Sequence, residues 1–145
     1  MSRKEVATTA VRSIARSTNE VWPILRRFED LGWALGQGVS SFEASGRGVG
    51  MLRTATAPHD GGRIVEQLTA LDDPGMSIEY VIVEGGIPSL EDYAARAQVL
   101  PLGDGCEIRW HCRAKVDAGQ AAQGQAILSG MADRMAELFA SQFES

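Results

Sequence analysis

The residues from Val39 to Val116 alternate between apolar and polar side chains, and this period of two constrains the fold more than any other sequence feature. Such alternation is typical of β-strands that bury one face and expose the other. Clusters of glycine, proline and aspartate interrupt it at residues 46–50, 58–62, 72–75, 84–89 and 101–105. Strands that follow one another without intervening helices form an antiparallel meander. We therefore predict about six consecutive antiparallel strands in this part of the chain.

The segment before this region has a different pattern. Residues 5–15 are rich in β-branched side chains and predict a first strand. A Ser-Thr-Asn-Glu motif follows, a capping box in which Ser17 accepts a hydrogen bond from the amide of Glu20 and the glutamate reaches back. Apolar residues then recur at helical spacing, but Pro23 lies past the first turn and removes a hydrogen bond. The pattern predicts two short helices before the glycines of residues 31–38.

The last part of the chain predicts one long amphipathic helix. Residues 120–143 contain no proline, and their apolar side chains recur every three or four positions. These apolar positions are Ile127, Leu128, Met131, Met135, Leu138 and Phe139. The whole order of elements predicts an α+β fold in a single domain spanning residues 1–145. In this arrangement the long helix lies across the concave face of a curved antiparallel sheet of seven strands, and two short helices follow the first strand.

Length and charge limit the partners of the chain. The 145 residues suit one domain with its own core. A net charge of −5 argues against nucleic acid as a partner, because nucleic acid requires a basic face. No apolar run approaches the roughly 20 residues of a membrane span, and the N-terminus lacks the apolar stretch of a secretory signal. We expect a cytoplasmic monomer or homodimer whose partner is a small hydrophobic molecule.

The cysteines and histidines do not predict a metal site. Cys106 and Cys112 lie on or beside one predicted strand, too far apart to form a disulfide, which suits a reducing compartment. His59 and His111 have no metal-ligand spacing with these cysteines. The adjacent His111 and Cys112 point to opposite faces of a strand. We expect neither a metal nor another cofactor.

Residues 107–116 alternate cleanly between an apolar and a charged face. The charged face predicts a solvated His111, whereas Cys112, on the apolar face, is predicted to be a small buried residue rather than a nucleophile. The inward residues of this strand and its neighbour are Ile108, Trp110, Cys112, Ala114 and Val116, and Tyr93, Ala95, Ala97 and Val99. Several are small, so the space beneath the helix is either a pocket or filled by larger helix residues; Met131 and Met135 suit both. The inward face of residues 77–84 remains open: either Ile78, Tyr80 and Ile82 or Val81 and Val83.

One predicted hairpin carries a charge of each sign on its apolar face. A turn centred between His59 and Asp60 places Arg53 opposite Glu66, and Phe42 of the preceding strand can join the same face. Opposed side chains in an antiparallel pair are about 5 Å apart at Cβ, so the two charges can pair. Two interpretations remain open. The pair is either a structural salt bridge at the rim of the sheet, half in water, or a polar anchor for a ligand inside a largely apolar cavity.

Several segments, taken in order, resemble the START-like, SRPBCC superfamily, which has the helix-grip fold. They are residues 17–22 with 26–29, GVGMLRT at 48–54, IVEQLTALDD at 64–73, VEGGIPSLEDY at 83–93 and the C-terminal helix. The resemblance covers essentially the whole chain and is closest to the bacterial polyketide cyclase/dehydrase-like group and to plant abscisic-acid receptors. It implies a deep apolar cavity for a small hydrophobic ligand and, in some members, cyclase, aromatase or lyase chemistry.

The resemblance also implies roles for particular residues. Pro58 falls on the proline of the receptors' mobile gate loop, and residues 85–93 correspond to their latch. Glu66 and Tyr93 match positions that line the receptors' pocket, and Cys112 falls where they have a glutamate. The lysine that binds the ligand carboxylate in the receptors and the histidine–arginine pair of their latch have no counterpart here. Recognition of abscisic acid is therefore not implied.

Three hypotheses about function follow. The first is a carrier or sensor of a small hydrophobic or amphipathic molecule, whose ligand-binding residues are Phe42, Arg53, Pro58, Glu66, Tyr93, Trp110, Cys112, Met131 and Met135. The second is a cyclase or lyase in the same cavity, with Glu66 as base, Tyr93 as proton donor and Arg53 stabilising a developing enolate. The third is an interaction module without a ligand, which the polar outer faces of the strands disfavour.

Overall fold

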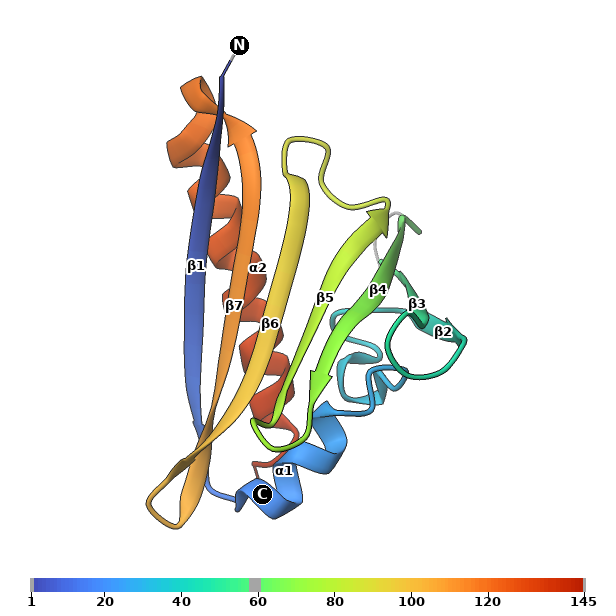
Figure 1. The fold of residues 1–145 in the computed structure, drawn as a ribbon, viewed down its shortest axis with the longest axis vertical. Coiled ribbons are helices and arrows are strands. Elements are labelled where there is room, and N and C mark those ends of the chain that lie inside the picture. The colour runs from blue at the N-terminus through green and yellow to red at the C-terminus, as the bar shows by residue number, and fades with distance from the viewer. Residues whose placement is uncertain (1, 58–60, 145) are drawn as a thin grey trace.

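One antiparallel sheet and one long helix account for most of the fold (Figure 1). The computed structural model describes residues 2–57 and 61–144. Within these ranges the strands are β1 (Arg3–Ile14), β2 (Ser41–Ser45), β3 (Leu52–Thr56), β4 (Arg63–Asp72), β5 (Ser77–Glu84), β6 (Glu91–Leu102) and β7 (Gly105–Asp117). The helices are α1 (Thr18–Leu25), α2 (Ala121–Ser141) and the 3-10 turns η1 (Gly32–Ala34) and η2 (Ala118–Gln120). The predicted α+β helix-grip architecture is confirmed.

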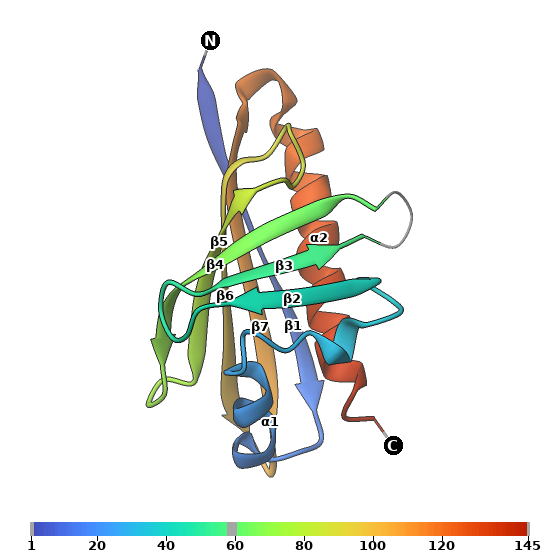
Figure 2. The same cartoon turned by 90° about the vertical axis from the view of Figure 1, so that its right-hand side faces the viewer.

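The strands form one sheet in the order β1-β7-β6-β5-β4-β3-β2, and all neighbours are antiparallel. The six strands predicted between residues 39 and 116 are therefore the meander from β2 to β7. β1 extends the sheet beyond the meander by pairing with β7, with Arg3 opposite Asp117 and Ile14 opposite Cys106. The sheet curves, so that β2, β3 and β4 run across α2 while β1 and β7 run alongside it (Figure 2). This curvature gives the sheet a concave face, and α2 lies along the β1 and β7 side of it.

The segment between β1 and β2 contains two short helical elements, the α-helix α1 and the 3-10 helix η1. α1 has eight residues and includes Pro23. The predicted capping box is wrong in detail, because the Ser17 hydroxyl donates to the Glu20 carboxylate (3.4 Å) and makes no capping hydrogen bond to the helix backbone. α1 is attached to the turn between β4 and β5, where Asp73 accepts hydrogen bonds from Trp22 Nε1 (2.9 Å) and Arg26 Nε (2.8 Å).

α2 packs against β1 and β7 rather than against β2–β5. The inner residues of β6 and β7 are accordingly among the most deeply buried in the protein: Ala97, Val99, Ile108 and Cys112 are 0% exposed. Polar contacts also hold α2 beside β1, since Arg12 Nε lies 2.8 Å from Glu137 Oε2 and Gln125 Nε2 donates to the Ala7 carbonyl. The main core therefore lies between α2 and the half of the sheet formed by β1, β7 and β6.

Two glycines of α2 are expected to respond to alanine in opposite directions. A Cβ at Gly124 would lie 2.6 Å from Val116 Cγ1, whereas a Cβ at Gly130 has no neighbouring atom within 4 Å. We expect Gly124→Ala to lower the free energy of unfolding by about 1–2 kcal/mol, because the extra methyl overpacks the contact between α2 and β7. Gly130→Ala should raise it by about 0.5–1 kcal/mol through helix propensity alone. Urea denaturation of both variants measures the two effects, and a shift of the same sign in both would contradict this packing.

Candidate ligand-binding cleft

Burial is uneven across the concave face of the sheet. The inward-facing side chains of β6 and β7 are fully covered, but Phe42 on β2, Ile64 on β4 and Ile82 on β5 are only partly buried although they face the same way. On α2, Met131 and Met135 are also only partly buried. α2 packs against β1 and β7, and Phe28 covers Arg53 on β3 and Tyr80 on β5. The partly buried side chains lie on the rest of this inner face and on α2, and we call the region between them the cleft.

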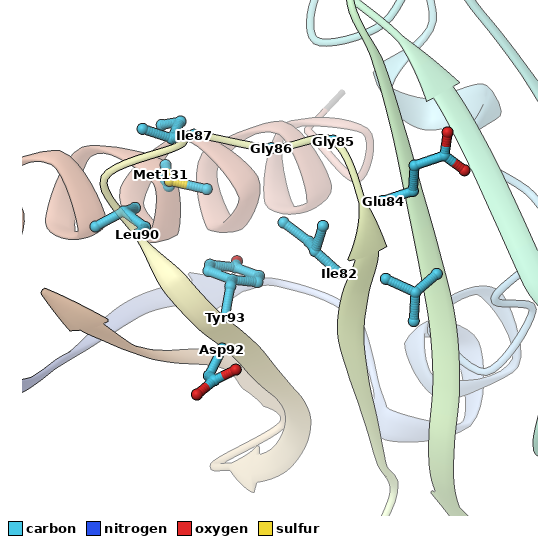
Figure 3. Close-up of a pocket in the computed structure, with 10 residues that line it drawn as sticks. Ile82, Glu84, Gly85, Gly86, Ile87, Leu90, Asp92, Tyr93 and Met131 are labelled. Carbon is cyan, nitrogen blue, oxygen red and sulfur yellow. The ribbon is translucent and has the colours of Figure 1, made fainter.

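One end of this cleft is a pocket of about 200 Å³, which we call the mouth. Its apolar lining consists of Ile82 and Val83 at the end of β5, Ile87 and Leu90 in the loop between β5 and β6, Tyr93 on β6 and Met131 on α2. Figure 3 shows the side chains of Ile82, Tyr93 and Met131 directed into the space between the strands and the helix. Glu84 and Asp92 lie at the rim, and their carboxylates point away from Tyr93 and Met131 (Figure 3).

The mouth lies where the regular pairing of two strand ladders is interrupted. Between β4 and β5 the register shifts so that Val83 has no partner, and between β6 and β7 it shifts between Glu91 and Ala94. Asp92, inside the second irregularity, has a positive φ of 52°. Such bulges re-aim side chains next to binding sites. Here the second irregularity contains Asp92 and Tyr93, the β6 residues that contribute to the lining.

Arg53 and Glu66 form a buried ion pair on the inner face of β3 and β4, directly opposite each other as the hairpin pattern predicts. Arg53 Nε donates to Glu66 Oε1 at 2.9 Å, and Nη2 lies 2.7 Å from the same oxygen. The Arg53 side chain is 3% exposed and that of Glu66 is 13% exposed. The pair therefore lies in the interior rather than half in water at the rim of the sheet.

The guanidinium of Arg53 is enclosed by residues outside the hairpin. Its Nη1 donates to the carbonyl oxygen of Phe28 at 2.9 Å. The Phe28 ring centroid lies 3.9 Å from Arg53 Cζ, and that of Tyr80 lies 5.1 Å from it. Cation–π contacts of this kind stabilise a desolvated arginine. Nη2 has no well-aligned acceptor among the described residues, so the charge of Arg53 depends on Glu66 for compensation.

Two further polar contacts lie beside the ion pair. The Tyr93 hydroxyl is 3.1 Å from Cys112 Sγ, and Trp110 Nε1 donates to the Tyr80 hydroxyl at 3.0 Å. Burial raises the pKa of Cys112 to about 11, and burial also raises the pKa of the Tyr93 phenol well above its ordinary value. Both groups are therefore protonated at neutral pH, and the fully buried Cys112 thiol is not poised as a nucleophile.

The structure brings only some of the sequence-predicted site residues together. Tyr93 and Met131 line the mouth, and Met135 follows one helical turn further along α2. Glu66 lies next to the mouth, since its partner on β5 is Ile82. Phe42 is partly buried on β2, and Arg53 is buried on β3 opposite Glu66. Trp110 and Cys112 are buried on β7, and Pro58 lies outside the described residues.

The structure adds residues that the sequence did not single out. Ile87 and Leu90 belong to a loop that carries no periodic pattern, and Ile82 and Tyr80 lie on the strand whose inward face was left open. That strand places Ile78, Tyr80 and Ile82 inward and leaves Val83 51% exposed. Phe28 contributes through its backbone carbonyl, a contact that no sequence pattern identifies.

The described residues contain no group of three or more histidine, cysteine or carboxylate side chains arranged to hold a metal ion. Cys106 and Cys112 are both buried free thiols. His111 lies on the outer face of β7, where its Nδ1 is 2.8 Å from Thr9 Oγ1. Among the helices of residues 2–57 and 61–144, none combines the length and apolar character needed to cross a membrane.

The sequence from residue 5 to residue 144 matches the family model for polyketide cyclase/dehydrase and lipid transport proteins. The protein belongs to this family. The match extends over nearly the whole chain and confirms the resemblance to the SRPBCC superfamily. No curated protein sequence matches the chain.

Solved structures of similar shape include a plant enzyme and a bacterial protein. Norcoclaurine synthase from Thalictrum flavum, a point mutant in complex with a transition-state analogue, is 19% identical with a TM-score of 0.80, covering 99% of this chain and 96% of that chain. XoxI from Bacillus cereus is 19% identical with a TM-score of 0.81, covering 95% of both chains. At these identities the similarity shows the fold alone, and the fold is the one described above.

Proposed function

We propose that this member of the polyketide cyclase/dehydrase and lipid transport family binds a small hydrophobic or amphipathic molecule in the cleft between α2 and the inner face of β2–β5. One observation carries the proposal: Phe42, Ile64 and Ile82 on the inner face of this half of the sheet stay partly accessible, while the inward-facing side chains of β6 and β7 are buried. A folded protein seldom leaves an apolar concave surface uncovered unless something occupies it. The family description, which includes lipid transport, supports the same conclusion.

The proposed ligand lies with its apolar body against Ile82, Leu90 and Met131, which converge at the mouth. Its polar end reaches toward Glu66 and the Tyr93 hydroxyl. In small-molecule sites a few placed polar groups set the orientation of the ligand, and Glu66 and Tyr93 would do so here. Phe42 and Met135 extend the apolar wall on either side of the cleft.

A cyclase- or lyase-type reaction in the same cleft is the second candidate. It is favoured by the partly accessible carboxylate of Glu66 and by the nearby phenol of Tyr93, which is protonated at neutral pH because burial raises its pKa. In this hypothesis Glu66 removes a proton and Tyr93 supplies one, while Arg53, which Phe28 and Tyr80 enclose, acts only through its ion pair with Glu66. Turnover of a bound molecule that is lost in Tyr93→Phe, while binding persists, would support this candidate; unchanged turnover in that variant would exclude it.

Filling the mouth is expected to abolish binding. Met131→Trp places an indole into a pocket of about 200 Å³, and because Met131 is only partly buried the helix should tolerate the change. Ligand-induced stabilisation is about 2.7 kcal/mol at a hundredfold excess over Kd, so its loss is readily measured as a missing thermal shift. Ala126→Trp, on the exposed side of α2, is the matched control and should leave the shift intact. An equal shift in the Met131 variant would place the ligand elsewhere.

A further inference from the structure

We infer that the cleft selects a neutral ligand that carries a hydroxyl group and rejects ligands that carry a carboxylate. This inference rests on the proposed function and specifies the chemistry of the ligand's polar end. It follows from which half of the Arg53–Glu66 pair faces the cleft, and from the charges at the rim.

The positive half of the pair is shielded. Arg53 is 3% exposed, its Nη1 is committed to the Phe28 carbonyl, and the rings of Phe28 and Tyr80 lie against its guanidinium. Its Nε and Nη2 both lie against one carboxylate oxygen, Glu66 Oε1. An incoming anion therefore has no approach to the arginine without displacing packed side chains.

The negative half of the pair is the accessible one. The Glu66 side chain is 13% exposed, several times more than that of Arg53. Both contacts from Arg53 are to Oε1, and no group in residues 2–57 or 61–144 donates a hydrogen bond to Oε2. A carboxylate oxygen accepts hydrogen bonds and cannot donate them. Glu66 lies next to Ile82, which lines the mouth, so we take its Oε2 as the polar group that a ligand in the cleft meets, and this oxygen requires a donor from the ligand.

The rim of the cleft adds no cation. Among the described residues that line the mouth, the charged ones are Glu84 and Asp92. Asp92 has a cationic neighbour in Lys115, whose Nζ lies 3.7 Å away, but both side chains are more than half exposed and the contact is screened by water. A ligand carboxylate would lose its hydration without gaining a counter-ion, and it would face Glu66.

A hydroxyl group avoids both penalties. It is neutral, so it brings no charge into the cleft, and its O–H can donate to Glu66 Oε2. Hydrogen bonds to an ionised acceptor are stronger than those between neutral groups, so the hydroxyl should add affinity over a purely apolar ligand. Because Arg53 keeps Glu66 compensated, the carboxylate does not require a cationic ligand as its partner.

Three probes with one scaffold test the inference: 2-naphthol, 2-naphthoate and 2-methylnaphthalene, titrated against the full chain at pH 7. We expect 2-naphthol to bind at least about tenfold more tightly than 2-naphthoate, because burying an uncompensated charge outweighs the 1.4 kcal/mol that corresponds to a tenfold change. 2-Naphthol should also bind more tightly than 2-methylnaphthalene. These ratios are measured on the unmodified protein and do not depend on whether a variant folds.

The variant Glu66→Gln is expected to reduce this selectivity. Glu66→Gln retains an oxygen for Arg53 Nε but removes the negative charge, and its amide can donate to a ligand oxygen. The preference for 2-naphthol over 2-naphthoate should then fall by about tenfold or more. Glu79→Gln removes an exposed carboxylate on the outer face of β5 and serves as the matched control, with the preference expected to stay within about twofold because this charge lies outside the cleft and is screened.

The outcomes separate the inference from the proposed function. Equal binding of 2-naphthoate and 2-naphthol, equal binding of 2-methylnaphthalene and 2-naphthol, or an unchanged ratio in a folded Glu66→Gln protein would overturn the inference while leaving a ligand-binding cleft. Binding of none of the three probes, in the unmodified protein, would count against the proposed function itself. The expected order, with a reduced preference in the Glu66→Gln variant, would support both.

Discussion

Glu66→Leu is expected to lower the free energy of unfolding by about 3–5 kcal/mol, because it leaves a buried guanidinium without a counter-ion. Arg53 is 3% exposed, and its Nη2 has no aligned acceptor in the described parts of the chain, so no other group there takes over from the glutamate. The Phe28 carbonyl and the rings of Phe28 and Tyr80 still contact the guanidinium in this variant, but they compensate only part of its charge. Denaturant unfolding followed by circular dichroism measures the loss.

Removing both charges should restore most of this stability. In Arg53→Met/Glu66→Leu, the interior receives two apolar side chains of similar size, and replacing a buried ion pair in this way is often neutral or stabilising. We expect the double variant to lie within about 1.5 kcal/mol of the unmodified protein, a coupling of several kcal/mol in the double-mutant cycle. If the two single variants lose little and add independently, the pair is solvated and the account of Glu66 as the accessible half of a buried pair is wrong.

Gly85→Ala should also be strongly destabilising, by about 2–4 kcal/mol. Gly85 begins the loop between β5 and β6 with a φ of 81°, and a Cβ there would overlap the backbone carbonyl oxygen of Arg63. A backbone atom cannot rotate away as a side chain can. The loop must therefore shift, and with it Ile87 and Leu90, so ligand binding should weaken together with stability. Thermal denaturation with and without 2-naphthol records both effects.

The matched control is Gly48→Ala. Gly48 has a φ of 63°, but no atom lies within 4 Å of a Cβ placed on it. It therefore isolates the conformational strain of a left-handed alanine, about 1–2 kcal/mol. A loss at Gly85 no larger than that at Gly48 would mean that the contact between the loop and Arg63 is not as tight as described.

The register of the sheet could be predicted from the sequence because a one-residue slip moves every side chain to the other face. The pairing of Arg53 with Glu66 and the inward face of β7, from Ile108 to Val116, followed from alternation and turn position alone. The long helix followed from its apolar spacing. These are local patterns with a fixed geometric consequence, which is why the predicted architecture is confirmed.

Other features depend on how separate strands and helices pack against one another, which the alternation of residues along a single strand does not predict. The strand from Ser77 to Glu84 has apolar residues on both faces, so its inward side became clear only from its pairing with β4 and β6. The ladder irregularities that shape the mouth, and the approach of the Phe28 carbonyl to Arg53, join segments far apart in sequence. The side on which α2 packs decides where the cleft opens, and the amphipathic pattern of the helix predicts only which of its residues face the sheet.

The most direct test of a ligand cleft between α2 and β2–β5 uses the methionine methyl groups as reporters. Met131 lines the mouth from α2 and Met135 follows one helical turn later, whereas Met76 lies in the turn between β4 and β5, at the other end of β5 from the mouth. We would record methyl spectra of ¹³C-methionine-labelled protein during titration with 2-naphthol. We expect saturable shifts of the Met131 and Met135 methyl resonances and no shift of the Met76 methyl resonance. Shifts confined to Met76, or no saturable shift at Met131 and Met135, would contradict it.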